Sequence, residues 1–339
     1  MKRLLNTLYV TSGNKYLSLE GENIVVLEDQ KEIGRVPLHN LQAIVTFGYT
    51  GASPALMGVC AQRNIDLSFM SGNGRFLARV TGEVKGNVTL RKQQYRISDN
   101  QEESIRIARN FILGKVYNSR WILERAIRDY SMRLDVETIK KKSLFLDQSI
   151  GKIRVCENAD ELLGLEGEAA SVYFSVFDDL ILQQKEDFYF HGRNKRPPLD
   201  NVNAMLSFGY SLLAGMCGSA LETVGLDPYV GFFHTDRPGR MSLALDLMEE
   251  FRSVMVDRFV LTLINKKVMK EKYFIKKENE AVIMTDEGRK AFLSKKQESI
   301  KHPFLNEKIE WGMAPYVQSM LLARYLRGDL DEYPPFFWK

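Results

Sequence analysis

The segment GFFHTDRPGRMSLALDLMEEFR, residues 231–252, combines one histidine with acidic residues in a helical pattern. At about 100° per residue, a helix over residues 243–257 places Asp246, Glu249, Glu250 and Asp257 along one edge and its large apolar side chains on the other. Asp246 and Glu249 are three residues apart, so one helix offers both carboxylates to the same point. The simpler alternative is a solvated acidic face, because like charges at this spacing cost only about 0.2–0.5 kcal/mol on an exposed helix.

A further acidic candidate, Glu166, lies in DELLGLEGEAASVYFSV, residues 160–176. Helical projection surrounds Glu166 with apolar neighbours and turns Glu168 to roughly the opposite side. Those neighbours are Leu162, Leu163, Ala169, Ala170 and Tyr173. A buried carboxylate requires a counter-charge, hydrogen-bond donors or a retained proton. An arginine partner is the simplest structural explanation for Glu166, and a functional site is the other.

His234 follows the apolar run YVGFF and precedes the charged turn TDRPGR. It is either a hydrogen-bonded residue at the edge of the core or a ligand at the edge of a polar cleft. Together with Glu166, Asp246 and Glu249 it would form a site of carboxylates and a single imidazole, without thiolates. Such a site suits Mg²⁺ or Mn²⁺ better than structural zinc. Non-haem iron normally requires two histidines with one carboxylate, and no second histidine is placed here.

The elements that must position these residues change in character along the chain. Residues 1 to about 95 contain short β-rich runs separated by Gly, Asn and Asp, whereas helical spacing dominates from about residue 96 to the end. We therefore expect an α+β protein with a β-rich N-terminal domain, residues 1–95, and a larger all-α domain, residues 96–339. Helix starts are expected after Ser53, Asp200 and Thr285, with a hairpin just before the last of these.

Composition narrows the class of protein further. The chain of 339 residues is 45% hydrophobic and 27% charged, with a formal charge of +4, which is typical of a globular protein with a sizeable core. Its three cysteines are far apart and odd in number, which argues against a disulfide framework or a cysteine zinc site and favours a reducing cytoplasm. We find no signal peptide and no run of about 18 apolar residues, and so expect no membrane span.

Basic residues gather in three places. The loop HGRNKRPP carries Arg193 and Arg196, and Arg237 and Arg240 flank His234. An anionic phosphate drawn to these arginines would approach the candidate metal site; the alternative is a solvated basic loop. A long helix spanning residues 104–133 is also basic, and would be a face that tracks a nucleic-acid duplex or merely a soluble one. Its basic residues are Arg106, Arg109, Lys115, Arg120, Arg125, Arg128 and Arg133.

Three of these motifs resemble, in order and spacing, those of the CRISPR-associated integrase family (Cas-one), the DNA-cutting and DNA-joining subunit of spacer acquisition. They are GLEGEAASVYF, FHGRNKRPPLDNVNAMLSFGYSLL and HTDRPGRMSLALDLMEEFR. The resemblance covers nearly the whole chain, since the family has the same domain order. The final DEYPPFFWK is similar to the ending seen in the type I-C branch. The family's metal ligands fall on Glu166, His234 and Glu249, with Asp246 in support. Asp246 and Glu249 compete for the direct bond, and we assign it to Glu249.

The resemblance implies a function. The protein would be a metal-dependent DNA endonuclease and transesterase, in which the 3′-hydroxyl of a short foreign DNA fragment attacks a backbone phosphate at a CRISPR repeat. The family acts as a homodimer joined through its N-terminal domains, with a small ferredoxin-like partner (Cas-two). The candidate DNA contacts are Arg193, Arg196, Tyr210, Arg237 and Arg240. Two alternatives stay open: a metal-dependent repair nuclease for branched DNA, and a non-catalytic DNA-binding scaffold.

Overall fold

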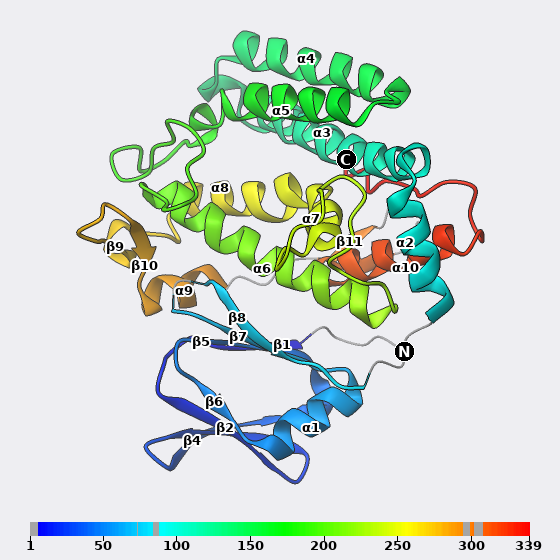
Figure 1. Ribbon diagram of the computed structural model, residues 1–339. Coiled ribbons are helices and arrows are strands. Elements are labelled where there is room, and N and C mark those ends of the chain that lie inside the picture. The colour runs from blue at the N-terminus through cyan, green and yellow to red at the C-terminus, as the bar shows by residue number, and fades with distance from the viewer. Residues whose placement is uncertain (1–5, 73, 84–87, 294–298, 302–307) are drawn as a thin grey trace.

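The computed structural model describes residues 6–72, 74–83, 88–293, 299–301 and 308–339. Figure 1 shows two β-sheets at one end of the molecule and tiers of helices above them. This is the α+β arrangement expected from the sequence, with the strand-rich part first and the mostly helical part after it.

The described residues up to 83 form two four-stranded sheets and one α-helix. In the first sheet, β1, β5 and β7 are parallel and β8 is antiparallel to β7. In the second, β4, β3 and β2 are antiparallel, and β2 pairs in parallel with the short β6. The strands are β1 (Asn6–Val10), β2 (Lys15–Glu20), β3 (Asn23–Glu28), β4 (Lys31–Pro37), β5 (Leu41–Phe47), β6 (Gly51–Ala52), β7 (Asp66–Met70) and β8 (Phe76–Val80). With α1 (Pro54–Arg63) they enclose a small separate core that includes Leu17, Ile44 and Leu67.

The described residues after β8 are mainly helical. The helices are α2 (Val88–Asp99), α3 (Gln101–Tyr130), α4 (Val136–Val155), α5 (Ala159–Phe174), α6 (Asn201–Thr223), α7 (Ser242–Glu249), α8 (Arg258–Asn265), α9 (Asp286–Leu293) and α10 (Ala314–Leu326). Two short hairpins, β9 (Phe274–Lys276) with β10 (Val282–Met284) and β11 (Ser299–Lys301) with β12 (Lys308–Glu310), interrupt them. This part of the chain is therefore not purely α, and α2 crosses the boundary expected at residue 95.

The helix starts follow the local chemistry of the sequence. The side chain of Ser53 accepts a hydrogen bond from the N–H of Leu56, and Pro54 occupies the first helical position of α1. Asp200 caps α6 by accepting from Asn203, and Thr285 accepts from Gly288 at the start of α9. These three expected caps are confirmed.

The two long helices α3 and α6 each pack against several other helices. α3 turns one face into the core, where Ile105, Ala108, Ile112, Val116 and Ser119 are all buried. In the packed structure, α3 contacts α4, α5 and α7. By length and composition alone, α6 is apolar enough to cross a bilayer, but 61% of its apolar window is buried inside the protein. Its apolarity is accounted for by core packing against α7 and α10.

Candidate active site

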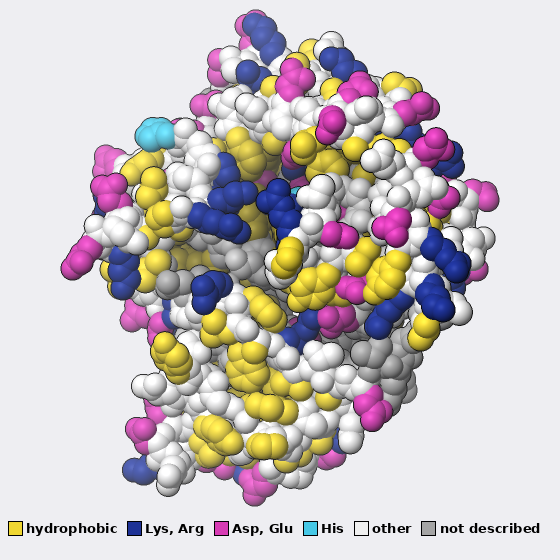
Figure 2. Space-filling view, viewed as in Figure 1, with side chains coloured by type: hydrophobic (Ala, Val, Ile, Leu, Met, Phe, Trp, Pro, Cys, Tyr) yellow, Lys and Arg dark blue, Asp and Glu magenta, His cyan; other side chains and the backbone are white. Residues whose placement is uncertain are grey.

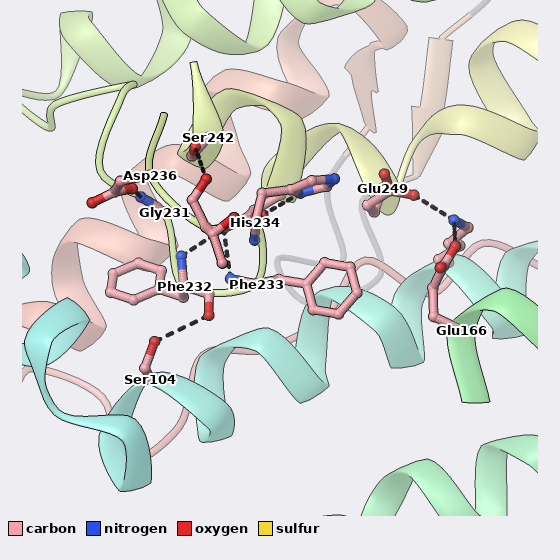
Figure 3. Close-up of polar contacts among 12 residues, drawn as sticks. Ser104, Glu166, Gly231, Phe232, Phe233, His234, Asp236, Ser242 and Glu249 are labelled. Atoms are coloured by element: carbon pink, nitrogen blue, oxygen red, sulfur yellow. Dashed lines mark hydrogen bonds and ion pairs between the residues drawn. The ribbon is translucent and has the colours of Figure 1, made fainter. Parts of the chain in front are cut away.

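The histidine loop is organised around one fully buried carboxylate. Asp246, on α7, is 0% exposed and accepts hydrogen bonds from the backbone N–H groups of Phe232 (2.7 Å), Phe233 (3.0 Å) and His234 (2.9 Å). Its Oδ1 also accepts from Nδ1 of His234 at 2.6 Å. Both oxygens of Asp246 are therefore engaged by the loop, and the imidazole is held with Nδ1 against Asp246. Figure 3 shows the His234 ring extending from this loop toward Glu249.

The close approach of this loop to α7 requires glycine at residue 231. A Cβ at Gly231 would lie 2.8 Å from Oδ2 of Asp246 and 2.8 Å from the Cβ of Ser242. These separations are shorter than any ordinary van der Waals contact. The glycine thus lets the backbone reach the carboxylate that fixes His234.

Three elements bring the two remaining carboxylates to one ammonium group. Nζ of Lys115, on α3, forms ion pairs with Oε1 of Glu166, on α5, and with Oε2 of Glu249, at the end of α7, the latter at 2.7 Å. Oε1 of Glu249 accepts from Nε of Arg252 at 2.9 Å. Glu166 therefore has a counter-charge as the sequence requires, but the expected arginine partner is wrong: the partner is a lysine from a different helix. Glu168 is exposed on the other side of α5, as expected.

The acidic edge of α7 is buried rather than solvated. Asp246, Glu249, Glu250 and Asp257 are all 3% exposed or less, which rules out the solvated-face alternative. The single α-helix assumed in the projection is wrong beyond Glu249: α7 ends there, and a π-helical segment, Arg252–Asp257, follows before α8. Segments of π-helix are rare and often occur at functional sites. Each of the four acids faces its own set of buried partners.

The electrostatic environment keeps Glu249 ionised. Burial alone would raise the pKa of its carboxyl, but the charges of Arg252, Lys115 and His234 outweigh burial and lower the pKa to about 2. A fully ionised carboxylate next to an imidazole is what a hard divalent cation binds.

The next residue, Glu250, faces a different environment. Burial raises its pKa to about 8, against hydrogen bonds from Tyr333, the N–H of Phe336 and Gln318. The pKa values of these two adjacent acids are therefore shifted in opposite directions, and of the two only Glu249 faces the candidate site. Tyr333 and Phe336 belong to the C-terminal tail, whose contribution could not be seen from its sequence.

The donor set can be tested against a divalent cation. Within the described part of the chain, no three His, Cys, Asp or Glu side chains already converge as a ligand cluster. Instead, the positive charge between Glu166 and Glu249 is the ammonium of Lys115. A single cation thus already occupies the point between the two carboxylates. His234 is close enough for its charge to help lower the pKa of Glu249. Carboxylate oxygens with one imidazole fit Mg²⁺ or Mn²⁺ in type and charge, provided that Lys115 moves aside.

A cavity of about 320 Å³ opens beside these carboxylates and is lined by basic side chains. Lys115, Arg193, Lys195, Arg196 and Arg252 all contribute to its wall. Burial and the charges of neighbouring arginines lower the pKa of Lys195, as expected where positive charge is concentrated. Figure 2 shows Lys and Arg side chains gathered around a hollow near the middle of this face of the molecule.

The five candidate DNA contacts divide into two kinds. Arg193 donates to Asn203 Oδ1 (2.7 Å) and Ser207 Oγ (3.1 Å), and its guanidinium lies over the ring of Tyr210. Tyr210 is buried, and its hydroxyl donates to Asp257. These two residues are tied into the cavity wall. Arg196 and Arg237 are exposed and Arg240 is half-buried, and they lie in the loops next to the site.

Comparison with known proteins assigns the chain to a family. The model for "CRISPR associated protein Cas1" matches residues 8–298. The chain is 48% identical to CRISPR-associated endonuclease Cas1 1 of Chlorobaculum tepidum and 49% identical to CRISPR-associated endonuclease Cas1 2 of Rhodospirillum rubrum. Each alignment covers 100% of both chains.

Solved structures share the fold at lower identity. A casposase bound to integration product superposes with a TM-score of 0.83 and 24% identity, covering 99% of this chain and 95% of that one. A Cas6-RT-Cas1–Cas2 complex contains a chain that matches with a TM-score of 0.81 and 20% identity, covering 100% of this chain and 36% of that one.

Proposed function

The chain belongs to the CRISPR-associated Cas1 family, and from this we propose that it is a metal-dependent endonuclease and integrase of CRISPR adaptation. It would insert short foreign DNA fragments at CRISPR repeats by attack of a fragment 3′-hydroxyl on a backbone phosphate. One observation carries the proposal: Glu166 and Glu249, from different helices, meet around a single positive charge beside an imidazole that a buried aspartate holds.

We assign the ligand roles from these contacts. Glu166, Glu249 and His234, through its Nε2, would hold Mg²⁺ or Mn²⁺, which neutralises charge on the phosphate and polarises the attacking hydroxyl. Asp246 is proposed as the support of His234, since both of its oxygens already serve the histidine loop. Arg252 fixes the Glu249 carboxylate from its other oxygen. No separate general base is assigned.

The cavity supports the choice of substrate. Its exposed cations, together with Arg237 and Arg240 near His234, would hold an anionic DNA backbone against the site. We propose that Arg196, Arg237 and Arg240 contact phosphates and that Arg193 and Tyr210 shape the wall behind them.

We propose the remaining features by analogy with relatives. A Cas2-type partner is supported by the fold match to a chain in a complex named for both Cas1 and Cas2. A homodimer through the two sheets and membership of the type I-C branch are further proposals. A cytoplasmic location agrees with three buried free thiols.

A strand-joining assay tests the function. The protein, with its small partner, is offered a short duplex with free 3′-hydroxyls and a plasmid carrying the repeat array, in Mg²⁺, Mn²⁺ or EDTA. We expect joining that requires metal, an approximately 10–100-fold loss in Asp246→Asn, and a larger loss in His234→Ala and Glu249→Gln. Asp236→Asn is the control, because Asp236 accepts from the same loop at the longer distance of 3.3 Å.

The alternatives predict different products. Metal-dependent cutting of branched DNA without joining would favour the repair nuclease. DNA binding without chemistry in any metal, unchanged by His234→Ala, would leave a non-catalytic scaffold.

A further inference from the structure

Lys115 is the only described side chain whose ion pairs join Glu166 to Glu249. It comes from α3, whereas the carboxylates come from α5 and α7, so one ammonium connects three helices. Its side chain is 16% exposed, and those of Glu166 and Glu249 are 17% and 4% exposed. In Figure 3, dashed contacts from Glu249 and from Glu166 meet at one unlabelled nitrogen, which the two ion pairs identify as Nζ of Lys115.

The position of the ammonium follows from tight packing of α3 against the end of α7. A Cβ at Gly114, the residue before Lys115, would lie 3.0 Å from Cγ of Glu250. The glycine lets the backbone of α3 pass directly beside the Glu249–Glu250 pair. The Lys115 side chain is thereby delivered to the point between the carboxylates.

Without a cation at this point the two carboxylates would repel each other at low solvent exposure. Arg252 offsets only Glu249, from the opposite oxygen. At a few ångströms, a unit charge interacts by several kcal/mol at the effective dielectric of a partly buried site. The ammonium is therefore what holds Glu166 and Glu249 together in the structure as it stands.

We infer that Lys115 is the internal counter-cation of the proposed metal site: it keeps Glu166 and Glu249 assembled before metal binds, and it competes with the divalent ion for them. This inference rests on the proposed function. A divalent ion and an ammonium cannot both lie between the same two oxygens. The flexible stem of a lysine allows the ammonium to withdraw, and Lys115 already lines the cavity next to the site.

Mn²⁺ binding and thermal unfolding of the complete protein test the inference without any activity measurement. Free Mn²⁺ is followed by electron paramagnetic resonance in titrations of wild type, Lys115→Met and Lys115→Arg. We expect Lys115→Met to unfold at a lower temperature than wild type in EDTA, and yet to bind Mn²⁺ about tenfold more tightly. Lys115→Arg keeps the charge, so it should restore the unfolding temperature in EDTA without the gain in Mn²⁺ affinity.

The matched control substitutes another lysine that forms an ion pair with a glutamate of α3. Lys140, on α4, pairs with Glu124 of α3 at 2.8 Å, away from the site. Lys140→Met should leave Mn²⁺ affinity unchanged. If Lys115→Met does not fold, Lys115→Gln, which keeps N–H donors but no charge, carries the same expectation.

The outcomes separate this inference from the function on which it rests. Equal or weaker Mn²⁺ binding by both uncharged variants would overturn the role of Lys115 alone. A purely structural lysine would lower the unfolding temperature by the same amount in EDTA and in Mn²⁺. No Mn²⁺ binding by wild type or any variant would refute the metal site itself.

Discussion

At the scale of single residues, the buried acids between residues 246 and 257 have different environments because their partners differ. Asp246 accepts hydrogen bonds from backbone N–H groups, Glu249 pairs with cationic side chains, and Asp257 accepts from a tyrosine hydroxyl. Burial raises the pKa of Asp257 to about 6, although the hydroxyl of Tyr210 and the charge of Arg252 oppose the rise. Asp257 therefore titrates close to neutral pH, whereas Glu249 is ionised throughout the physiological range.

Asp257 makes stability depend on pH in a defined direction. Its pKa is about 6 in the folded protein and about 3.9 when unfolded, so the folded state retains a proton that the unfolded state releases. The stabilisation is complete below about pH 4 and is lost as pH rises through 6. Asp257→Asn has no such group, so its stability relative to wild type should increase by on the order of 1 kcal/mol between pH 5 and pH 8. Urea unfolding at the two pH values measures the difference.

The control for this experiment is an acid that stays ionised across the same pH range. Hydrogen bonds from Thr138 lower the pKa of the exposed Asp135, so its contribution to stability is lost only below about pH 4. The stability of Asp135→Asn relative to wild type should therefore be the same at pH 5 and at pH 8. A difference between Asp257→Asn and wild type that does not change with pH would contradict the assigned pKa.

Residue types and spacing were enough to single out four candidates. Glu166 projects among apolar neighbours, Asp246 and Glu249 are three residues apart on one helix edge, and His234 lies in the charged loop before them. Lys115 could not be selected in the same way. It is one of six basic residues of α3, and its partners Glu166 and Glu249 are far from it in the sequence. Nothing local in the sequence distinguishes it from a solvated lysine.

At the scale of elements, the C-terminal tail that carries Tyr333, Phe336 and Trp338 contacts Glu250, the residue directly after Glu249, and Asn118 of α3. Asn118 of α3 donates to the carbonyl groups of Glu250 (2.7 Å) and Phe336 (2.8 Å), and accepts from the N–H of Trp338 at 2.7 Å. The guanidinium of Arg258, at the start of α8, lies over the Trp338 ring. The tail thus ties α3, the residue after Glu249 and α8 together. Periodicity alone predicted one continuous helix here, since these tertiary contacts have no local signature.

Removing the Trp338 side chain tests this role of the tail. Trp338 is 5% exposed, so Trp338→Ala should cost about 3–5 kcal/mol of unfolding free energy. Because the tail supports the segment after Glu249, hydrogen exchange should also accelerate in residues 250–257. Lys339→Ala is the control: this exposed side chain lies over the Trp121 ring, and we expect less than about 0.5 kcal/mol. Faster exchange confined to the tail would show that the tail does not hold the site.

At the scale of the whole molecule, a formal charge of +4 is small, and its distribution matters more than its size. Most basic residues of α3 have intramolecular partners. Arg109 contacts the carbonyl of Cys156, Arg120 pairs with Asp147, and Arg125 lies over Trp338. A duplex-tracking face along α3 is therefore not favoured. The exposed cations around the cavity are the better site for an extended polyanion.

That distribution predicts which arginines control the salt dependence of DNA binding. Removing one cation that neutralises a phosphate should reduce the slope of log K against log[salt] by about 0.9. Arg196 and Arg237 are exposed next to the site, so Arg196→Gln with Arg237→Gln should lower the slope by roughly 2.

Two further variants serve as controls. Arg193→Gln should instead lower the unfolding temperature, because it breaks hydrogen bonds to Asn203 and Ser207. Arg63→Gln, on α1 and paired with Glu22, should change the slope little. Fluorescence titrations of a short duplex from 50 to 300 mM salt, about the range that resolves such slopes, measure the slope for each variant. A slope that the double variant leaves unchanged would place the DNA elsewhere on the molecule, and the cavity beside Glu249 would then not be its path to the site.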